Sequence, residues 1–588
     1  MHDLKVPIIY NGMNGFRNLS EQETIRLAEL GNRADDWRRV VVADGFAPDT
    51  IIGCRFRGDV AIGSRVVIED SAIENYEIGD GTVIRNVTAL ECRHRSTFGN
   101  GTEVETVNEN GGRSVVIFDR MSAQYAYMAA MYRHRPQLTA RLQSIAAEYA
   151  ESKSAATGRI GRNCRIVGTK FIRETNVGDG VAIEGASLLE NGTVLDGAKI
   201  GVDVKAQDFI AAEDSTLDLG ATCRRCFIGE SAIISNGFTA ENSLFFANSH
   251  CENGEAAAIF AGPYTVSHHK SSLLIAGMFS FFNAGSGTNQ SNHLFKGGAV
   301  HQSVHRRGCK FASNAYVMSP AAEGAYTMIM GRHTKHHDTS KMPFSYLVES
   351  NGTSQLMPAM NLRSYGTLRD IGKWRKRDRR TVRRDVIDFE EYNPYATSMA
   401  VEAVKILQRL QDEHPDEAVY HYRNTTIKSS MLRLGLKLYD KYIVGALSDM
   451  LSRGGEDLRS DGTGDWADIA GQYVSHRAID RLIDGIESGA IASSEGIDKY
   501  LRDFDSRYDD YARSWAVDAL AERLGHTPTA EDIAEAVEAG HRAKVSMREA
   551  AEADLAKENS ADMSVGYGTD STTDEERMDD FRAVRGLV

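Results

Sequence analysis

Three features are scarce in this chain of 588 residues, and each scarcity excludes a class of protein. No run of about 18 uncharged apolar residues occurs, so the sequence predicts no membrane span. The N-terminus lacks a basic segment followed by a long apolar one, which argues against secretion through a signal peptide. Positive charge is outnumbered, with a net charge of -14 and a pI near 5.7, which argues against a general nucleic-acid-binding protein.

Cysteine and proline are also few. The seven cysteines form an odd, scattered set, which is typical of reduced thiols in a cytoplasmic protein and not of a disulfide framework. There are 10 prolines against 53 glycines, and the glycines crowd the first two thirds of the chain. Many turns with few prolines favour a turn-rich β architecture there.

What is present is a short repeat. Large aliphatic residues recur in steps of five or six at Ile160, Ile166, Ile172, Val177, Ile183, Leu189, Leu195 and Ile200. Helices would give steps of three and four, and antiparallel strands steps of two. The same rhythm runs through 61–84. A six-residue step predicts one inward aliphatic for each short straight segment, with a turn between segments.

This pattern resembles the hexapeptide-repeat, left-handed β-helix superfamily. The stretch IEDSAIENYEIGDGTVIRNV is similar to the β-helix of sugar-nucleotide pyrophosphorylases and trimeric acyltransferases. RNLSEQETIRLAELGNRADDW and AGPYTVSHHKSSLLIAGMFSFFNAGSGTNQSNH also resemble a large bacterial family with a β-helix core. The resemblance implies a homo-oligomer, with a trimer favoured, that acts on a small sugar derivative. The cysteines, the charge and the hydropathy predict a cytoplasmic protein with no nucleic-acid partner and no membrane span.

The predicted fold is mainly β plus α: a left-handed parallel β-helix with a helical insertion and a C-terminal α-helical domain. A capping box at Ser20 begins a helix that ends at Gly31. Steps of three and four replace the six-residue rhythm near the C-terminus. The predicted units are an N-terminal helical cap (1–45), the β-helix (46–350) with its insertion (89–157), a basic linker (351–392), the helical domain (393–557) and a mobile acidic tail (558–588).

Candidate chemistry concentrates at 248–349, which holds nine of the 17 histidines. Histidine suits proton transfer near neutral pH. The resemblance implies that a coil histidine deprotonates a sugar hydroxyl or amine, which then attacks an acyl thioester. The candidates for this base are His269, His293 and His301. Four nearby donors suit an anionic substrate, namely Lys270, Asn289, Asn292 and Lys296.

Two alternatives stay open. In a metal-assisted sugar-directed enzyme, histidines would hold Zn, and the candidate ligands are His268, His301, His305 and His333. In a non-catalytic scaffold, the β-helix would oligomerise and the helices would recruit a partner. Acyl-coenzyme A is the donor that the first reading implies, although no motif identifies a cofactor. Residues 373–384 hold eight basic residues, which predict either a phosphate-facing arm or, as favoured, a solvated linker that pairs with the acids after it.

Overall fold

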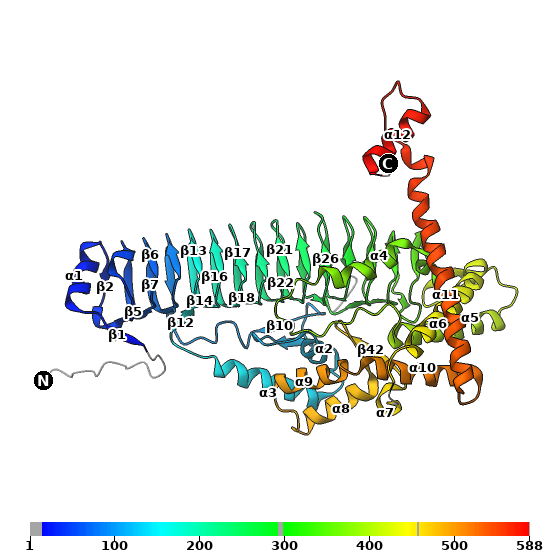
Figure 1. The fold of residues 1–588 in the computed structure, drawn as a ribbon, viewed down its shortest axis with the longest axis horizontal. Helices are drawn as coiled ribbons and strands as arrows, with labels where there is room; N and C mark the ends of the chain where they lie inside the picture. Colours follow the sequence, from blue (N-terminus) through cyan, green and yellow to red (C-terminus); the bar gives the residue numbers. More distant parts are fainter. Residues whose placement is uncertain (1–14, 292–297, 456–457, 587–588) are drawn as a thin grey trace.

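The computed structural model describes residues 15–291, 298–455 and 458–586, and its main feature is a long parallel β-solenoid (Figure 1). Two rows of parallel strands stack along it. The first row contains β5(Arg55–Ile62), β7(Ala72–Ile78), β9(Ala89–Glu91), β12(Gly158–Ile160), β14(Phe171–Val177), β16(Leu188–Val194), β18(Lys205–Ala211), β20(Thr222–Ile228), β22(Thr239–Phe245), β24(Glu255–Ala257), β25(Phe260–Ala261), β27(Leu273–Ile275), β28(Gly277–Phe279), β30(Asn289–Ser291), β31(Ser303–His305), β33(Tyr316–Met318), β34(Ala321–Glu323), β36(Arg332–His333) and β37(Asp338–Thr339).

The second row contains β4(Ile51–Ile52), β6(Val67–Glu69), β8(Val83–Arg85), β13(Arg165–Val167), β15(Ala182–Glu184), β17(Lys199–Ile200), β19(Thr216–Leu217), β21(Ile233–Ser235), β23(His250–Glu252), β26(Val266–Ser267), β29(Asn283–Ala284), β32(Lys310–Phe311), β35(Met328–Met330) and β38(Tyr346–Ser350). Strands β1(Phe16–Asn18), β2(Arg33–Ala34) and β3(Val40–Ala43) begin the first row. Hairpin partners elsewhere are β10(Glu103–Glu105), β11(Ser114–Val116), β39(Thr353–Met357), β40(Val419–Tyr422), β41(Thr425–Lys428), β42(Trp466–Ile469) and β43(Gln472–Ser475).

The coil length follows from corners that repeat every 17 residues. Left-handed backbone angles recur at this spacing at Glu174, Asn191, Asp208, Arg225 and Asn242. Asn and Asp tolerate this conformation because their short side chains bond locally. Asn191 Nδ2 donates to Asp208 Oδ1 at 2.7 Å, which ties one corner to the next. The predicted steps of six, six and five residues are therefore one coil with three corners.

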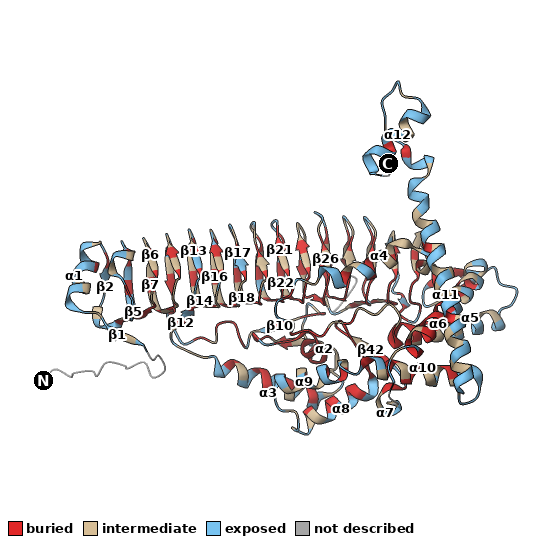
Figure 2. Cartoon of the chain, in the orientation of Figure 1, coloured by how far each residue is buried: buried red, intermediate tan, exposed pale blue. Residues whose placement is uncertain are grey.

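Buried residues recur along the strands of successive coils (Figure 2). Ile166, Ile183 and Ile200 pair in register and are buried. One predicted inward residue was wrong. Val194, not Leu195, aligns with Val177 and is fully buried, whereas Leu195 is half-buried in the following turn. Strand β16 ends at Val194, one residue before the position that a six-residue step from Leu189 gives.

The helices lie at the start of the solenoid, in its insertion and after its last coil. They are α1(Glu21–Glu29), α2(Ala123–Met131), α3(Pro136–Ser152), α4(Tyr365–Trp374), α5(Pro394–Glu413), α6(Ser429–Leu451), α7(Arg459–Gly462), α8(His476–Glu487), α9(Ser494–Asp505), α10(Tyr508–Leu524), α11(Ala530–Ala556) and α12(Asp574–Arg585). The capping box at Ser20 is confirmed. Within the described ranges, none of these helices is long and apolar enough to span a bilayer.

The insertion and the C-terminal helices meet beside the solenoid. In Figure 1, α2 and α3 lie along the same side as α8, α9 and α10, while α11 runs away from the solenoid toward α12. Arg135 in the loop before α3 pairs with Glu487 at the end of α8 at 2.8 Å. The predicted acidic tail carries α12, which starts with a capping box at Thr573, so this segment has local helical structure.

The basic segment is anchored to the protein by Arg380 and Arg384, which are buried, whereas its other arginines and Lys376 are exposed. Arg384 is buried and pairs with Glu213 at 2.8 Å and Glu230 at 3.2 Å, both on the solenoid. Asp385 accepts a hydrogen bond from the backbone N–H of Ala123 at 2.7 Å. The predicted pairing of this segment with the acids that follow it is seen at Arg375, whose Nη2 lies 2.9 Å from Glu390 Oε1. The segment therefore joins the solenoid to α2 through ion pairs and a hydrogen bond.

Candidate functional site

A cavity of about 1200 Å³ opens where the last coils, the insertion and the C-terminal helices meet. The solenoid contributes Arg306, Ser340 and Lys341 to its lining. The insertion contributes Tyr127, Met131, Tyr132 and His134. The C-terminal region closes the other side with residues of α5, α6, α8, α10 and β42. The site therefore needs three segments that are far apart in the sequence.

Arg306 is the cation at the solenoid wall of this cavity. It directly follows the last residue of β31, whose side chain, His305, lies inside the solenoid. Arg306 contacts the hydroxyl of Tyr395 on α5. Its Nε is buried and has no hydrogen-bond partner among the described residues. Arg306 thus supplies a cation to the cavity beside the Tyr395 hydroxyl.

Arg307 fixes the wall that carries Arg306. Its Nη1 pairs with Asp468 at 3.4 Å and donates to the Gly471 carbonyl at 3.2 Å. Its guanidinium lies 3.7 Å from the centre of the Phe281 ring and 4.5 Å from that of Tyr473. This buried arginine joins the last coils to the β42–β43 hairpin. The two consecutive arginines thus have different tasks, one facing the cavity and one holding its walls together.

The helices and β42 contribute acidic and aromatic side chains to the cavity, together with the cations Lys405 and Arg523. Burial raises the pKa of Asp468, while Arg307 opposes that shift. Trp466 and Trp515 donate their indole N–H groups to the carbonyls of Gly462 and Gly464 at 2.8 and 3.0 Å, which fixes both rings. Further acidic and imidazole side chains line the cavity, namely Glu402, Asp465, Asp480, Asp518, Glu522, His134 and His476.

Behind Arg306, polar residues replace the aliphatic columns inside the solenoid. Gln290 Oε1 accepts from the Ile275 backbone N–H at 2.9 Å, so its amide nitrogen faces His305 Nε2 at 2.7 Å as the donor. The proton of His305 therefore lies on Nδ1 and is donated to Glu323 Oε2 at 2.5 Å. His305 and Glu323 are both fully buried. They align with Phe279 and Thr339 of neighbouring coils in one inward column.

His337 completes this chain as an imidazolium. Its Nε2 donates to Glu323 Oε1 at 2.7 Å and its Nδ1 to the Lys335 carbonyl at 3.3 Å. Although burial opposes it, the bond to Glu323 raises the pKa of His337. Burial would raise the pKa of Glu323, but His305 and His337 hold it far below its ordinary value. For His333, burial and the nearby His337 lower the pKa to about 4.

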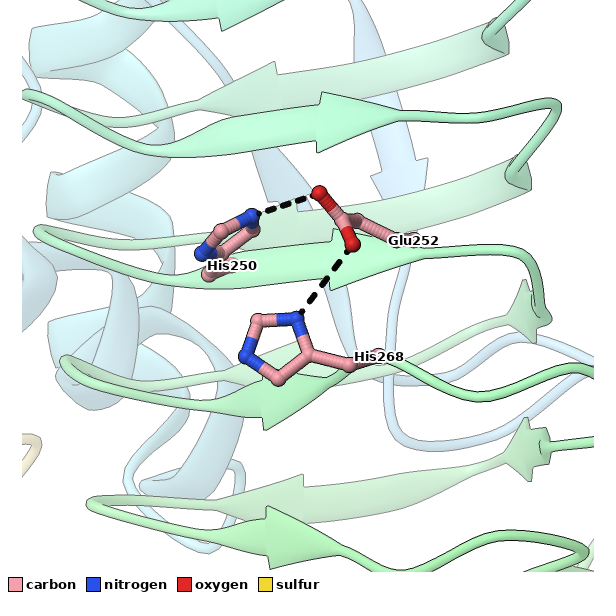
Figure 3. A group of neighbouring side chains, drawn as sticks. All are labelled: His250, Glu252 and His268. Atoms are coloured by element: carbon pink, nitrogen blue, oxygen red, sulfur yellow. Dashed lines mark hydrogen bonds and ion pairs between the residues drawn. The ribbon is translucent and has the colours of Figure 1, made fainter. Parts of the chain in front are cut away.

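The predicted site residues are spread over several places. His268 lies on the outer flank of the solenoid beside His250 and Glu252 (Figure 3). His269 and Lys270, the next two residues in the sequence, are exposed. Asn289 is half-buried on β30, and His301 is half-buried before β31. His305 and His333 lie inside the solenoid. Three predicted residues lie outside the described ranges, namely Asn292, His293 and Lys296.

Of the base candidates that the structure describes, neither His269 nor His301 lines the cavity, and His268 is separate from the interior pair His305 and His333. Sequence reasoning missed Arg306 and Lys341, along with His134 and His476 on the helical side. The available signal was the doubled arginine in VHRRG, which places two cations where a coil turns. No periodicity shows that helices from two other segments close over that turn.

These features define a class of protein: a parallel β-solenoid whose helical regions enclose a polar cavity against its last coils. The chain belongs to the family described as a domain of unknown function (DUF4954), whose model matches residues 60–411. A second domain of unknown function (DUF6819) matches residues 451–588. An uncharacterized protein of Treponema pallidum (strain Nichols) is 22% identical over 602 residues, covering 86% of this chain and 80% of that protein.

Both matched segments line the cavity, so the site lies between the two families' regions. The parallel solenoid predicted from the repeat is confirmed. Membership of the hexapeptide-repeat superfamily stays a prediction, because both matching models are described only as domains of unknown function.

Proposed function

We propose that the cavity binds an anionic sugar derivative, a sugar phosphate or a sugar nucleotide, and that the chain is a sugar-directed transferase. The observation that carries this proposal is the presence of Arg306 in the solenoid wall of the cavity. Arginine donates bidentate, charge-assisted hydrogen bonds to phosphate and carboxylate groups. Lys341 on the same wall adds a second positive charge.

The rest of the lining suits a polyhydroxylated ligand. Carboxylates accept hydrogen bonds from sugar hydroxyls, and aromatic faces pack against the apolar face of a sugar ring. Asp468 and Trp466 lie on the wall contributed by β42, and Tyr127 lies on the wall contributed by α2. A volume of about 1200 Å³ exceeds what a monosaccharide alone requires.

Acyl-type transfer is the chemistry that the resemblance of the solenoid favours. A rim histidine, His476 or His134, would take the proton of a sugar hydroxyl as its oxygen attacks the acyl carbon of a thioester. The new C–O bond would replace the C–S bond, and the thiolate would leave with that proton. This step rests on the fold resemblance and is separate from the binding proposal.

The binding proposal is tested by calorimetric titration of the full chain with glucose 6-phosphate, UDP-N-acetylglucosamine and unphosphorylated glucose. We expect a phosphorylated ligand to bind, with Kd weakened roughly 10- to 100-fold by Arg306→Gln, because a charged hydrogen bond contributes about 1.5–3 kcal/mol. Arg332→Gln is the matched control, since Arg332 is an exposed arginine over the Tyr316 ring on the same solenoid. It should leave the Kd unchanged.

Lys341→Gln provides a second, exposed position in case Arg306→Gln impairs folding. Absence of binding by the native chain, or equal binding by Arg306→Gln and the control, would overturn the binding proposal. Transfer is tested separately by thiol release from acetyl-coenzyme A in the presence of the bound sugar. We expect His476→Gln or His134→Gln to abolish release, while a native chain that binds sugar without releasing thiol would overturn the acyl-transfer step alone.

A further inference from the structure

A second site lies on the outer flank of the solenoid, away from the residues that line the cavity. Along β23, side chains alternate, so His250 and Glu252 point outward while Cys251 between them is fully buried. The next coil pairs His250 with Val266 and Cys251 with Ser267. Continuing this register places His268 beside Glu252. Two of the three side chains thus come from alternate positions of β23, and the third comes from the neighbouring coil.

The three side chains converge (Figure 3). His250 Nε2 lies 2.9 Å from Glu252 Oε1, and His268 Nδ1 lies 3.6 Å from Glu252 Oε2. The two imidazole rings are 4.3 Å apart between their centres. One ligand atom from each residue falls within 4.8 Å of the others. These separations fit donors that share one ion at bond lengths of about 2.0–2.2 Å.

The surroundings prepare these groups to bind a metal ion. Ser235, aligned with Glu252 on the previous coil, donates to Glu252 Oε1 at 3.2 Å and orients the carboxylate. Burial and the neighbouring His250 lower the pKa of His268. Burial would raise the pKa of Glu252, but His250 holds it below its ordinary value. The side chain of His268 is 40% exposed, which leaves the site accessible.

We propose that His250, Glu252 and His268 form a binding site for a divalent transition-metal ion of the zinc type. Two imidazoles and one carboxylate are a donor set for Zn²⁺ and its first-row neighbours, and a poor one for Mg²⁺ or Ca²⁺, which require mainly oxygen ligands. Three protein ligands leave a tetrahedral ion one position for water or an anion. The ion would also tie β23 to the turn that follows β26. This proposal is independent of the sugar-binding proposal.

The test uses the full chain after treatment with a chelator, titrated with Zn²⁺ and with Mg²⁺ and followed by calorimetry. We expect one Zn²⁺ per chain at this site and no comparable binding of Mg²⁺. Co²⁺ provides a spectroscopic probe, because a tetrahedral Co²⁺ ion with two imidazole ligands gives visible d–d bands. Bound metal should also raise the thermal midpoint in proportion to RT ln(1 + [L]/Kd).

His268→Gln and Glu252→Gln should each weaken Zn²⁺ binding at least tenfold and abolish the Co²⁺ bands. His269→Gln is the matched control, because His269 adjoins His268 and lies outside the cluster. It should bind as the native chain does. Ser235→Ala should weaken binding less than loss of a ligand does.

Circular dichroism without metal checks that each variant is folded, and His250→Gln replaces any that is not. Stoichiometric Zn²⁺ binding that persists in both His268→Gln and Glu252→Gln would place the metal elsewhere and overturn the proposal. Failure of the native chain to bind Zn²⁺ would overturn it equally, leaving the cluster as ion pairs between consecutive coils.

Discussion

Replacing Glu323 by leucine tests the chain of buried polar residues behind the cavity wall. The carboxylate accepts from His305 at 2.5 Å and from His337 at 2.7 Å, and all three side chains are fully buried. Leucine would leave the His337 imidazolium without its counter-ion and the His305 N–H without an acceptor. Removing one partner of a buried ion pair costs about 3–5 kcal/mol.

Hydrogen–deuterium exchange measured by mass spectrometry reports this cost locally, which suits a chain of several units. A loss of about 3 kcal/mol corresponds to exchange roughly 150-fold faster in peptides covering β31 to β37. Peptides from β14 to β18 serve as the internal control and should not change. The fold should persist, because inward positions of this column are apolar in earlier coils, as at Phe245 and Phe279.

A triple variant separates the effect of an unpaired buried charge from the effect of altered side-chain packing. His305→Phe, Glu323→Leu and His337→Leu together remove the carboxylate and both imidazoles bonded to it. We therefore expect most of the protection from hydrogen exchange to return. Replacing a complete buried ionic set by apolar residues is often neutral or stabilising. The reasoning is refuted if Glu323→Leu alone accelerates exchange less than about tenfold, or if the triple variant is no better protected than the single one.

Three further predictions concern the contacts between the units. Arg384→Met should expose 375–392 to limited proteolysis, because it removes the closest ion pairs of Glu213 and Glu230, whereas the exposed neighbour Arg383, 69% accessible, should tolerate the same change. Burial raises the pKa of Asp498 to about 6, so its stabilising contribution is present below about pH 4 and declines as pH rises through 6. Asp498→Asn should therefore raise the thermal midpoint at about pH 8 and not at about pH 4. The same difference in thermal midpoint between variant and native chain at both pH values would contradict this. Gly540→Ala should lower the free energy of unfolding of the C-terminal helices, measured by urea titration, by about 1–3 kcal/mol, because its Cβ would lie 2.1 Å from Ser448 Cβ and separate α11 from α6. Gly372→Ala, with nothing within 4 Å, should be neutral or stabilising, and equal effects would refute the packing argument.

Much of the solenoid was predictable, because its period is a local property. An inward aliphatic, a corner and the next inward aliphatic are separated by a fixed number of residues, so the repeat at Ile166, Ile183 and Ile200 is visible without any contact information. Capping at Ser20 is local in the same sense. Leu195 shows the limit, since the sequence pattern could not tell which of two adjacent aliphatics the corner turns inward.

The candidate sites were less predictable, for two physical reasons. The flank cluster depends on register: Glu252 meets His268 after 16 residues, whereas most earlier coils take 17. A shift of one residue would turn His268 to the other face of the strand. The abundance of histidine was enough to predict His268 as a candidate metal ligand. It was not enough to predict that His250 and Glu252 lie beside it.

The cavity depends on long-range packing. The doubled arginine is visible in VHRRG, yet only the tertiary structure decides that Arg307 joins Asp468, 161 residues away, and that Arg306 faces a cavity closed by α2 and α5. The sequence by itself determined the repeat, its turns and the amphipathic helices, because these arise from neighbours along the chain. The tertiary structure decided which polar residues share a site, because burial and charge pairing between distant segments are set only when the helices pack against the last coils.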